Sequence, residues 1–328
     1  MRESEKHGGL LEGEPKEEND MDQAKTLRRM MEEGKEGVPE EKSRGGEAAD
    51  AVQVVAVTSG KGGVGKTNVV ANLAYSLCRL KRRVLILDAD MGLANLDVLL
   101  GLVPKYTIQH VLTGEKTPEE IIIEGPGGMK ILPASSGIQE LTELTSQQRM
   151  ALLSQLESLN QRTDVLLIDT PAGISPNVMF FNTMANEIVI IVSPEPTSIT
   201  DAYAMIKILT TRYGEKYFHL LVNFVRDESE GLEVYRHLSM VTERFLNLSV
   251  RYLGFIPIDS HIQEAVRQQR AVAEIFPNCA AGRSFLALAK KVAGLSVPST
   301  PRGNLNLFWQ SLMGRPTDHR GEGILPRF

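Results

Sequence analysis

Gly60-Lys61-Gly62-Gly63-Val64-Gly65-Lys66-Thr67 is the stretch of this chain that decides the fold. Its spacing, G-x4-G-K-T, is that of a loop whose backbone N–H groups cradle the phosphates of a nucleoside triphosphate. The apolar, β-branched run at residues 52–57 predicts a strand before the loop, and the periodicity of residues 68–80 predicts a helix after it. We expect Lys66 to reach the β- and γ-phosphates and Thr67 to hold Mg²⁺. The other residues expected at the nucleotide are Gly60, Lys61, Gly62, Gly63, Val64, Gly65 and Asn68.

Two further apolar runs end in carboxylates. Residues 84–90 read Val-Leu-Ile-Leu-Asp-Ala-Asp, and residues 165–169 read Val-Leu-Leu-Ile-Asp. The carboxyl ends of strands open onto the ligand crevice in α/β sheets, so acids there are placed to act on magnesium and water. A single acid after a strand can equally be a helix cap. Three of them in this order after a phosphate loop favour nucleotide chemistry, and they are Asp88, Asp90 and Asp169.

The early lysine of the loop narrows the class of nucleotide-binding protein. The form Lys-Gly-Gly-Val-Gly-Lys-Thr resembles the deviant Walker A motif of the MinD/ParA family of dimerising ATPases. Residues 92–97 (Gly-Leu-Ala-Asn-Leu-Asp) resemble the first switch of that family, and residues 165–173 resemble its Walker B strand and second switch.

This resemblance implies roles for individual residues. Lys61 would cross a dimer interface to the nucleotide of the partner, and Asp90 would orient the attacking water. Asp88 would lie near Mg²⁺, Asp169 would hold Mg²⁺ through a water, and Gly173 would lie close to the γ-phosphate. The expected catalytic residues are therefore Lys61, Lys66 and Asp90.

A later segment resembles the part of the family that lies beside the adenine. Residues 254–259 read Gly-Phe-Ile-Pro-Ile-Asp, and by this match Pro257, Ile258 and Asp259 would contact the base. Asn223 ends a strand-like run where the family has an asparagine on the purine. Phe224 follows where a basic residue is common, so Asn223 is also compatible with a simple turn position.

Length and composition predict one large α/β domain. The chain has 328 residues, of which 42% are hydrophobic, enough for a single extensive core. Because most strand-like runs are apolar throughout, we expect a doubly wound, mostly parallel sheet with helices on both faces, over residues 51–295. Further strands are expected at 129–134, 187–192, 218–223 and 250–255, and further helices at 147–160, 198–213 and 262–269.

Cysteine and histidine patterns remove competing metal chemistry. The two cysteines are distant in sequence and form no C-x-x-C motif, which argues against an iron–sulfur carrier and suits a reducing compartment. The six histidines show no ligand spacing, so Mg²⁺ is the only metal expected. No signal-peptide segment and no run of 18 apolar residues is present, which predicts a cytoplasmic protein.

The first 50 residues differ in character from the rest. They hold 9 Lys and Arg against 15 Asp and Glu, a net charge of −6, whereas the remainder carries +1. We expect a largely disordered acidic arm with one short helix at about 21–32. Its sequence resembles the activator motif of the FlhG/FleN flagellar-number regulators, which in that family binds and stimulates FlhF, a GTPase of the signal-recognition-particle class. The matching residues are Asp22, Gln23, Ala24, Leu27 and Arg28.

The last 33 residues, 296–328, predict a linker and an amphipathic helix at about 304–313. Five apolar side chains share one helical face there, and Trp309 suits a membrane interface. This helix would lie on the cytoplasmic membrane when ATP is bound, as at the C-terminus of MinD-like proteins, although it could instead pack on the protein's own core. The apolar residues are Leu305, Phe308, Trp309, Leu312 and Met313.

These features together predict a slow, dimer-activated ATPase that switches between membrane and cytosol and regulates flagellar number through an FlhF-like GTPase. Three alternatives stay open. A MinD proper would share the core and tail but has no need for the motif at residues 22–28. A ParA-type partitioning ATPase would need a basic surface for DNA, and DNA binding is not expected from a near-neutral core and an acidic arm. A non-enzymatic adaptor would hold nucleotide without turnover.

Overall fold

The structure is a computed structural model, and it describes residues 52–90, 95–134 and 163–295. Apolar runs form one sheet in this described part, with the strand order β3-β4-β2-β5-β1-β6-β7-β8. Every neighbouring pair is parallel except β3 and β4, which are antiparallel. The strands are β1 (Gln53–Ser59), β2 (Val84–Asp88), β3 (Ile123–Glu124), β4 (Lys130–Leu132), β5 (Val165–Ala172), β6 (Glu187–Val192), β7 (Phe218–Val225) and β8 (Arg251–Pro257).

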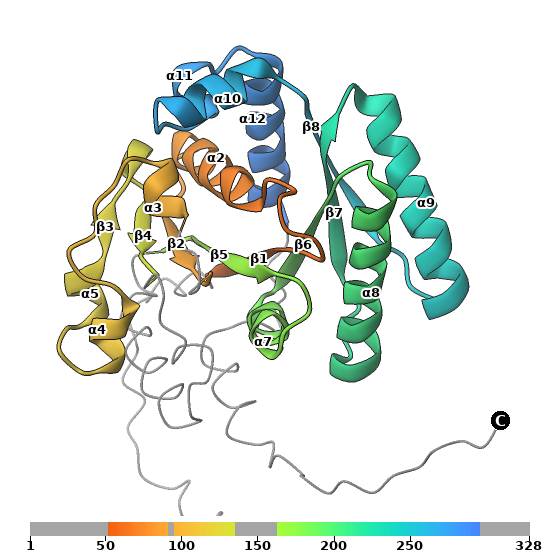
Figure 1. The fold of residues 1–328 in the computed structure, drawn as a ribbon, viewed down its shortest axis with the longest axis horizontal. Coiled ribbons are helices and arrows are strands. Elements are labelled where there is room, and N and C mark those ends of the chain that lie inside the picture. The colour runs from red at the N-terminus through yellow and green to blue at the C-terminus, as the bar shows by residue number, and fades with distance from the viewer. Residues whose placement is uncertain (1–51, 91–94, 135–162, 296–328) are drawn as a thin grey trace, which may run out of the picture. The chain divides into compact units, whose positions relative to one another are not determined.

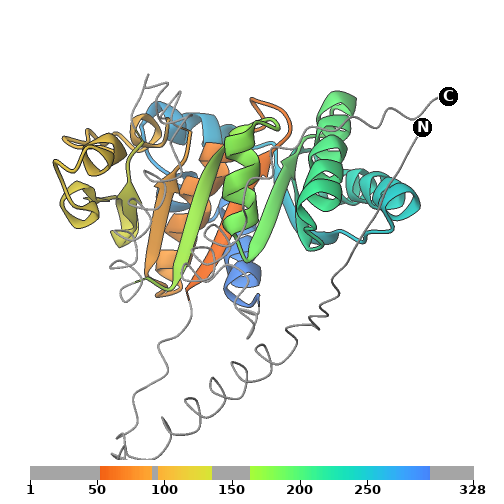
Figure 2. The same ribbon diagram turned by 90° about the horizontal axis from the view of Figure 1, so that it is seen from below.

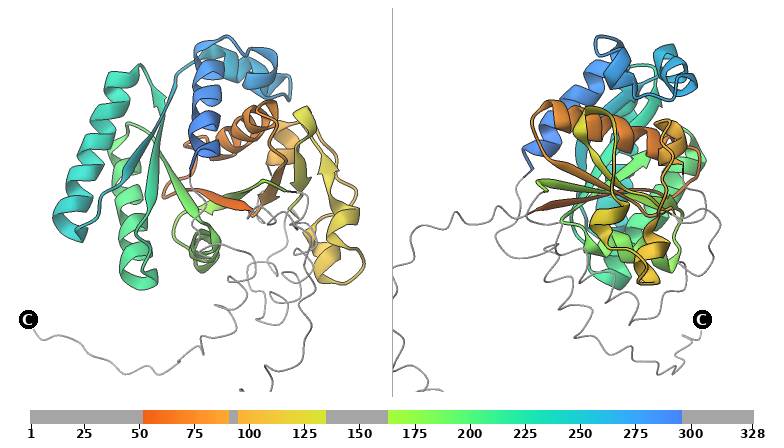
Figure 3. Two further views of the ribbon diagram at one scale, coloured as in Figure 1. Left: turned by 180° about the vertical axis from the view of Figure 1, so that it is seen from behind. Right: turned by 90° about the vertical axis from the view of Figure 1, so that its left-hand side faces the viewer.

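Helices cover both faces of this sheet (Figures 1 and 3). Successive residues of β1 point to opposite faces, so Val54 and Ala56 pack into one buried cluster and Val55 and Val57 into another. The first cluster is closed by α7 (Pro176–Met184), α8 (Pro196–Tyr213) and α9 (Glu228–Leu246), and the second by α2 (Lys66–Arg79) and α12 (Ala280–Ala293). Shorter helices are α3 (Leu96–Leu99), α4 (Ile108–Leu112), α5 (Pro118–Ile121), α10 (Ser260–Arg267) and α11 (Val272–Ile275).

The strand order places a ligand crevice beside β1. From β1 the chain passes through α2 to β2 on one side, while β6, β7 and β8 follow on the other side. Such a change of direction leaves a crevice at the carboxyl ends of the strands on either side of it. The phosphate loop, which links β1 to α2, lies at that end of the sheet (Figure 2).

The predicted fold class is confirmed, with differences in detail. The helix expected at 262–269 begins earlier, at Ser260, because Asp259 caps it, and the strand expected at 218–223 continues to Val225. The two-residue, antiparallel β3 was not predicted, since so short an edge strand leaves no pattern in the sequence. The helix expected at 147–160, the N-terminal arm and the C-terminal helix lie outside the described residues.

Candidate nucleotide site

The phosphate loop has the backbone geometry of an anion cradle. Gly63 and Gly65 adopt φ angles of +80° and +83°, in the left-handed region that side chains disfavour. No side chain caps the first turn of α2 in the described structure, which leaves its N–H groups available to phosphate oxygens. Gly60 is held against α8, because a Cβ atom there would lie 2.5 Å from the backbone C and O atoms of Asp201. The loop is therefore held against α8 at Gly60, while its N–H groups stay available to a ligand.

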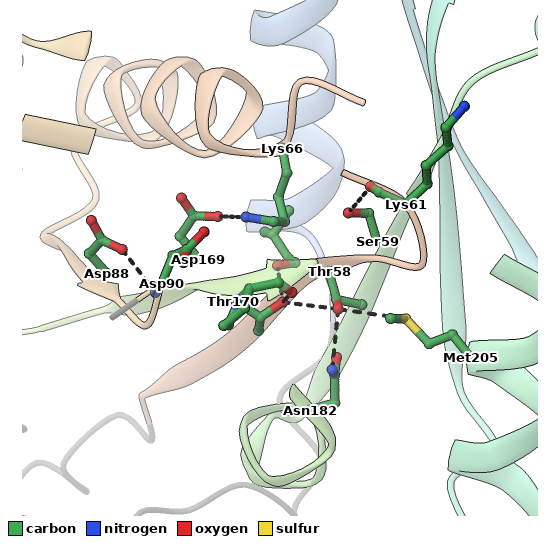
Figure 4. Close-up of polar contacts among 12 residues, drawn as sticks. Thr58, Ser59, Lys61, Lys66, Asp88, Asp90, Asp169, Thr170, Asn182 and Met205 are labelled. Atoms are coloured by element: carbon green, nitrogen blue, oxygen red, sulfur yellow. Dashed lines mark hydrogen bonds and ion pairs between the residues drawn. The ribbon is translucent and has the colours of Figure 1, made fainter. Parts of the chain in front are cut away.

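Lys66 and Asp169 form a buried pair at the floor of this cradle. The Lys66 Nζ atom lies 2.6 Å from Asp169 Oδ1, and the two side chains are 8% and 1% exposed (Figure 4). The second oxygen, Asp169 Oδ2, is buried without a hydrogen-bond partner among the described residues. Such an unsatisfied carboxylate oxygen is costly unless a ligand, a water or a metal completes it.

Asp88 lies beside Asp169 on the neighbouring strand and adds a second buried carboxylate. The two residues are in register between β2 and β5. Burial raises the pKa of Asp88 well above its usual value, and the Asp169 charge raises it further. Burial also raises the pKa of Asp169, although the Lys66 ammonium and the Thr67 hydroxyl counteract this. A divalent cation beside these two carboxyl groups would oppose both shifts and favour their charged forms.

These residues fit Mg²⁺. Asp88, Asp169 and Thr67 offer hard oxygen atoms of the kind that Mg²⁺ prefers. Asp90 N–H donates to Asp88 Oδ1 at 3.1 Å, which holds the backbone of Asp90 at the end of β2 (Figure 4). Asp90 thus lies next to the two buried acids, and its role in orienting water stays a prediction.

Lys61 extends away from this centre. Its ammonium group forms an ion pair with Glu195 and donates to Thr197 Oγ1 at 3.1 Å, at the start of α8. Its side chain is 36% exposed and is directed away from the Lys66–Asp169 pair (Figure 4). In a single protomer Lys61 and Lys66 therefore serve different partners.

Gly173 connects the second switch to the phosphate loop. Its N–H donates to the carbonyl oxygen of Ser59 at 2.9 Å, and its φ angle of +95° lies in the left-handed region. The end of β5 is thereby attached to the end of β1, which places Gly173 at the mouth of the loop.

A cavity of about 480 Å³ opens beside Gly65 and the start of α2, and its size and partly apolar lining suit a nucleotide base. Asn223 lines it, but its amide is already engaged: Nδ2 donates to Val64 O at 2.8 Å, and Oδ1 accepts from Phe224 N–H at 2.9 Å. The amide therefore supports the phosphate loop, and its contact with a purine stays a prediction. The lining residues are Gly65, Asn68, Asn223, Phe224, Ile256, Ile262, Gln263, Val266, Arg267 and Phe285.

The segment predicted beside the adenine has a second role. Pro257 ends β8, Ile258 is 65% exposed, and Asp259 caps α10. These three residues lie next to the cavity lining, and their contact with the base stays a prediction. Part of the apolar wall comes from α10, where Ile262 and Val266 are one helical turn apart. That spacing was a signal in the sequence that our prediction did not use.

Asp259 also belongs to a cluster with His261 and Cys279. Although burial opposes the shift, hydrogen bonds from Ala281 N–H, the His261 side chain and His261 N–H hold the pKa of Asp259 far below its usual value. Cys279 Sγ accepts from Gly282 N–H and caps α12. The cluster resembles a metal site in composition, but helix capping accounts for its contacts.

A buried polar network behind the loop was missed by sequence reasoning. Thr170 Oγ1 donates to Thr58 Oγ1 at 2.9 Å, and Asn182 Nδ2 reaches the same hydroxyl at 3.3 Å (Figure 4). The three residues come from β5, β1 and α7, so the network joins the strand before the phosphate loop to the second switch and the helix after it. Threonine and asparagine in apolar runs carry no pattern that would reveal such contacts.

None of the helices in the described part of the chain is both long enough and apolar enough to span a membrane.

Comparison with known proteins agrees with this geometry. A family model described as "AAA domain" matches residues 52–216. The chain is 46% identical to the antiactivator FleN of Pseudomonas aeruginosa over 81% of its own length and 95% of that protein. It is 36% identical to the flagellum site-determining protein YlxH of Helicobacter pylori, covering 77% of this chain and 84% of that one.

A solved structure shares the fold. The septum site-determining protein MinD of Pyrococcus horikoshii, complexed with Mg-ADP, superposes with a TM-score of 0.60 at 25% identity, covering 74% of this chain and 96% of that chain. The sequence likeness, the sheet order and the phosphate loop all indicate the same family. This chain belongs to the MinD/ParA family of P-loop ATPases, in the branch that contains FleN.

Proposed function

We propose that this protein is an ATP-hydrolysing switch that dimerises, associates with the cytoplasmic membrane and regulates the number and placement of flagella. The observation that carries this proposal is the phosphate loop with two separated lysines, in a chain 46% identical to the antiactivator FleN and 36% identical to a flagellum site-determining protein. The structure of MinD with Mg-ADP supports nucleotide and Mg²⁺ as the ligands of the same cradle.

Nucleotide binding replaces contacts within the protein by contacts with the phosphates. Lys66 gives up Asp169 for the β- and γ-phosphates, and the N–H groups of the loop and of α2 bind the phosphate oxygens. Mg²⁺ held by Thr67, Asp88 and Asp169 would neutralise charge on the phosphates. Asp169 thereby gains a partner for the oxygen that has none among the described residues.

Hydrolysis depends on a positioned water. Asp90 orients it for in-line attack on the γ-phosphorus, since phosphoryl transfer needs orientation and charge stabilisation more than a strong base. Lys61 leaves Glu195 and contributes its charge to the nucleotide of the partner protomer, so turnover requires the dimer. Because assembly limits the reaction, hydrolysis is slow.

The two ends of the chain link this cycle to its partners. Asp22, Gln23, Ala24, Leu27 and Arg28 bind and stimulate an FlhF-like GTPase, as their resemblance to the activator motif implies. The apolar face from Leu305 to Met313 binds the inner face of the cytoplasmic membrane. One such helix binds weakly, and two held by an ATP-bound dimer gain roughly 10²- to 10⁴-fold in avidity, so dimerisation controls residence on the membrane.

Asp90→Ala tests the switch. The variant should bind ATP as the parent does and remain dimeric, while hydrolysis falls by about 10²-fold or more because the water is no longer oriented. Phosphate release and size-exclusion chromatography with light scattering measure the two properties. Normal turnover in the variant would remove Asp90 from the mechanism.

Deleting the gene in its native host tests the biological role. Counts of flagella and minicells by electron microscopy separate the flagellar role from septum placement, which is the role of the MinD relative. Altered flagellar number with normal division is expected. Minicells with unchanged flagella would contradict the proposal.

A further inference from the structure

The edge of the sheet opposite the phosphate loop gathers the ends of several helices. The parallel strands all begin there, and α2, α8 and α9 return the chain to that edge before β2, β7 and β8. The end of α12 reaches it as well, since Gln53 Nε2 at the start of β1 donates to Val292 O at 3.0 Å. Figure 2 shows the phosphate loop and the end of α12 at opposite ends of the sheet. We call residues 79–83, 212–217, 244–251 and 290–295 the basal edge.

The basal edge is strongly cationic. It holds ten lysines and arginines, all exposed, against one glutamate, although residues 51–328 as a whole carry a net charge of only +1. The acids beside it are engaged: Asp164 pairs with Arg83, Glu187 is buried against His219, and Glu243 accepts from Ser239 and Ser249. Positive charge is therefore concentrated on one side of the domain.

Helix capping explains only part of this concentration. Cations near a helix C-terminus balance its dipole, and this accounts for Arg79, Arg212, Arg244 and the two lysines at the end of α12. The remaining cations lie beyond the helices, in the segments that lead into β2 and β7 and at the first residue of β8. Nothing in secondary structure requires charge at those positions.

Exposed aromatic rings lie among the cations. Tyr213, Tyr217 and Phe245 are 37%, 48% and 64% exposed, and arginines lie over two of these rings, Arg244 over Phe245 and Arg251 over Tyr217. Aromatic side chains with cations beside them are typical of a surface that meets lipid headgroups. A polynucleotide could bind the same cations, but it would not account for the amphipathic segment that follows this edge in the chain.

The chain leaves the domain from this edge toward its amphipathic segment. Helix α12 ends at Ala293, and the segment at 304–313 follows only eight residues after position 295. Eight extended residues span at most about 28 Å. A bilayer that takes up the apolar face of that segment therefore lies within reach of the basal edge.

We propose that the basal edge is a second membrane contact, which recognises the anionic headgroups of the bilayer while the C-terminal segment enters its apolar interface. The proposal rests on the membrane association proposed above and adds a lipid preference to it. Through the basal edge, membrane binding depends on lipid charge and on salt concentration. The C-terminal segment has few cations, so its own binding depends little on either.

Vesicle sedimentation with ATP tests this surface in the full-length protein. The triple variant Arg82→Gln, Arg212→Gln, Lys216→Gln removes three exposed edge cations, and Lys105→Gln, Lys207→Gln, Arg236→Gln removes three exposed cations elsewhere. On vesicles of phosphatidylcholine mixed with phosphatidylglycerol, the edge variant should bind at least ten-fold more weakly than the parent, since each cation near such a surface contributes roughly five-fold. The matched control should bind as the parent does, and both variants should keep the parental melting temperature and ATPase rate.

The remaining outcomes separate the two proposals. If the edge variant binds anionic vesicles as tightly as the parent, the basal edge is not a lipid contact. If the parent binds no vesicles at all while Phe308→Ser with Trp309→Ser changes nothing, the membrane association itself fails. If the edge variant loses retention of duplex DNA on filters but keeps vesicle binding, the surface belongs to nucleic acid and the lipid assignment is overturned.

Discussion

Lys61 and Lys66 lie five positions apart in one loop, yet their surroundings give them different energetic roles. Lys66 is buried with Asp169, so its loss would leave an uncompensated carboxylate inside the protein. The Lys61–Glu195 pair is exposed, and such pairs contribute about 1 kcal/mol or less. Little free energy therefore holds Lys61 within its own protomer, which suits a residue that must change partners.

Substituting each lysine should separate binding from assembly. Lys66→Ala should weaken ATP binding by at least 10²-fold and lower the melting temperature, because it removes a phosphate contact and the partner of Asp169. Lys61→Ala should retain ATP binding and parental stability but fail to form the ATP-dependent dimer. Titration with a fluorescent ATP analogue and size-exclusion chromatography distinguish them. A dimeric Lys61→Ala protein with normal turnover would show that this lysine has no role across the interface.

Asp259 should contribute stability that depends on pH. Its carboxylate accepts from the N–H groups of His261 and Ala281 and so joins the starts of α10 and α12. Since its folded pKa lies below its unfolded value of about 4, the contribution is present at neutral pH and is lost as pH falls below about 4. Asp259→Ala should lower the free energy of unfolding by about 1–3 kcal/mol at pH 7. Urea denaturation should show this difference shrinking toward pH 3, and a constant difference would contradict the assignment.

At the scale of the element, α12 has two functions that a pair of variants can separate. Phe285 is fully buried and also lines the cavity beside the phosphate loop, whereas Leu288 is buried against Gly254 outside the lining. Phe285→Ala should cost about 3–5 kcal/mol of stability, and Leu288→Ala about 2–5 kcal/mol. Only Phe285→Ala should weaken nucleotide affinity at a temperature where both variants are folded. Equal affinity loss in both would mean that general loosening of α12, not the cavity wall, affects the nucleotide.

Strand length explains why some elements could be predicted and others not. The central strands are buried on both faces, so each appears as an apolar run of five or more residues, and β6 falls at residues 187–192 as expected. Strand β3 and the four-residue helices α3, α5 and α11 are too short for any period to show. Their positions follow from packing against longer neighbours.

At the scale of the whole molecule, the N-terminal arm should be separable from the ATPase domain. Removing residues 1–50 should leave nucleotide affinity and melting temperature unchanged, because every residue of the candidate site lies after position 59. The truncated protein should no longer stimulate an FlhF-like GTPase, as measured by GTP turnover. Full-length protein with Leu27→Asp is the matched variant and should lose the same stimulation. Stimulation that survives both changes would place the GTPase contact on the ATPase domain.

The sequence by itself determined the class of chemistry and the type of fold. The loop at residues 60–67 is a local motif whose backbone geometry depends on its own glycines, and the apolar runs around it record burial on both faces of a sheet. The acids that end two of those runs could be placed near the phosphates for the same reason, since parallel strands open toward one edge.

Only the tertiary structure decided which distant residues meet. The Lys66–Asp169 pair spans 103 positions, the Asn223–Val64 bond spans 159, and the cavity beside the phosphate loop is lined by residues of that loop, β7, β8, α10 and α12. The basal edge likewise consists of four segments that are separated along the chain. No one of these segments would indicate a binding surface by its own sequence. The strand order, and the helices that lead the chain back across the sheet, bring these groups together. The periodicity of a single segment predicts neither of them.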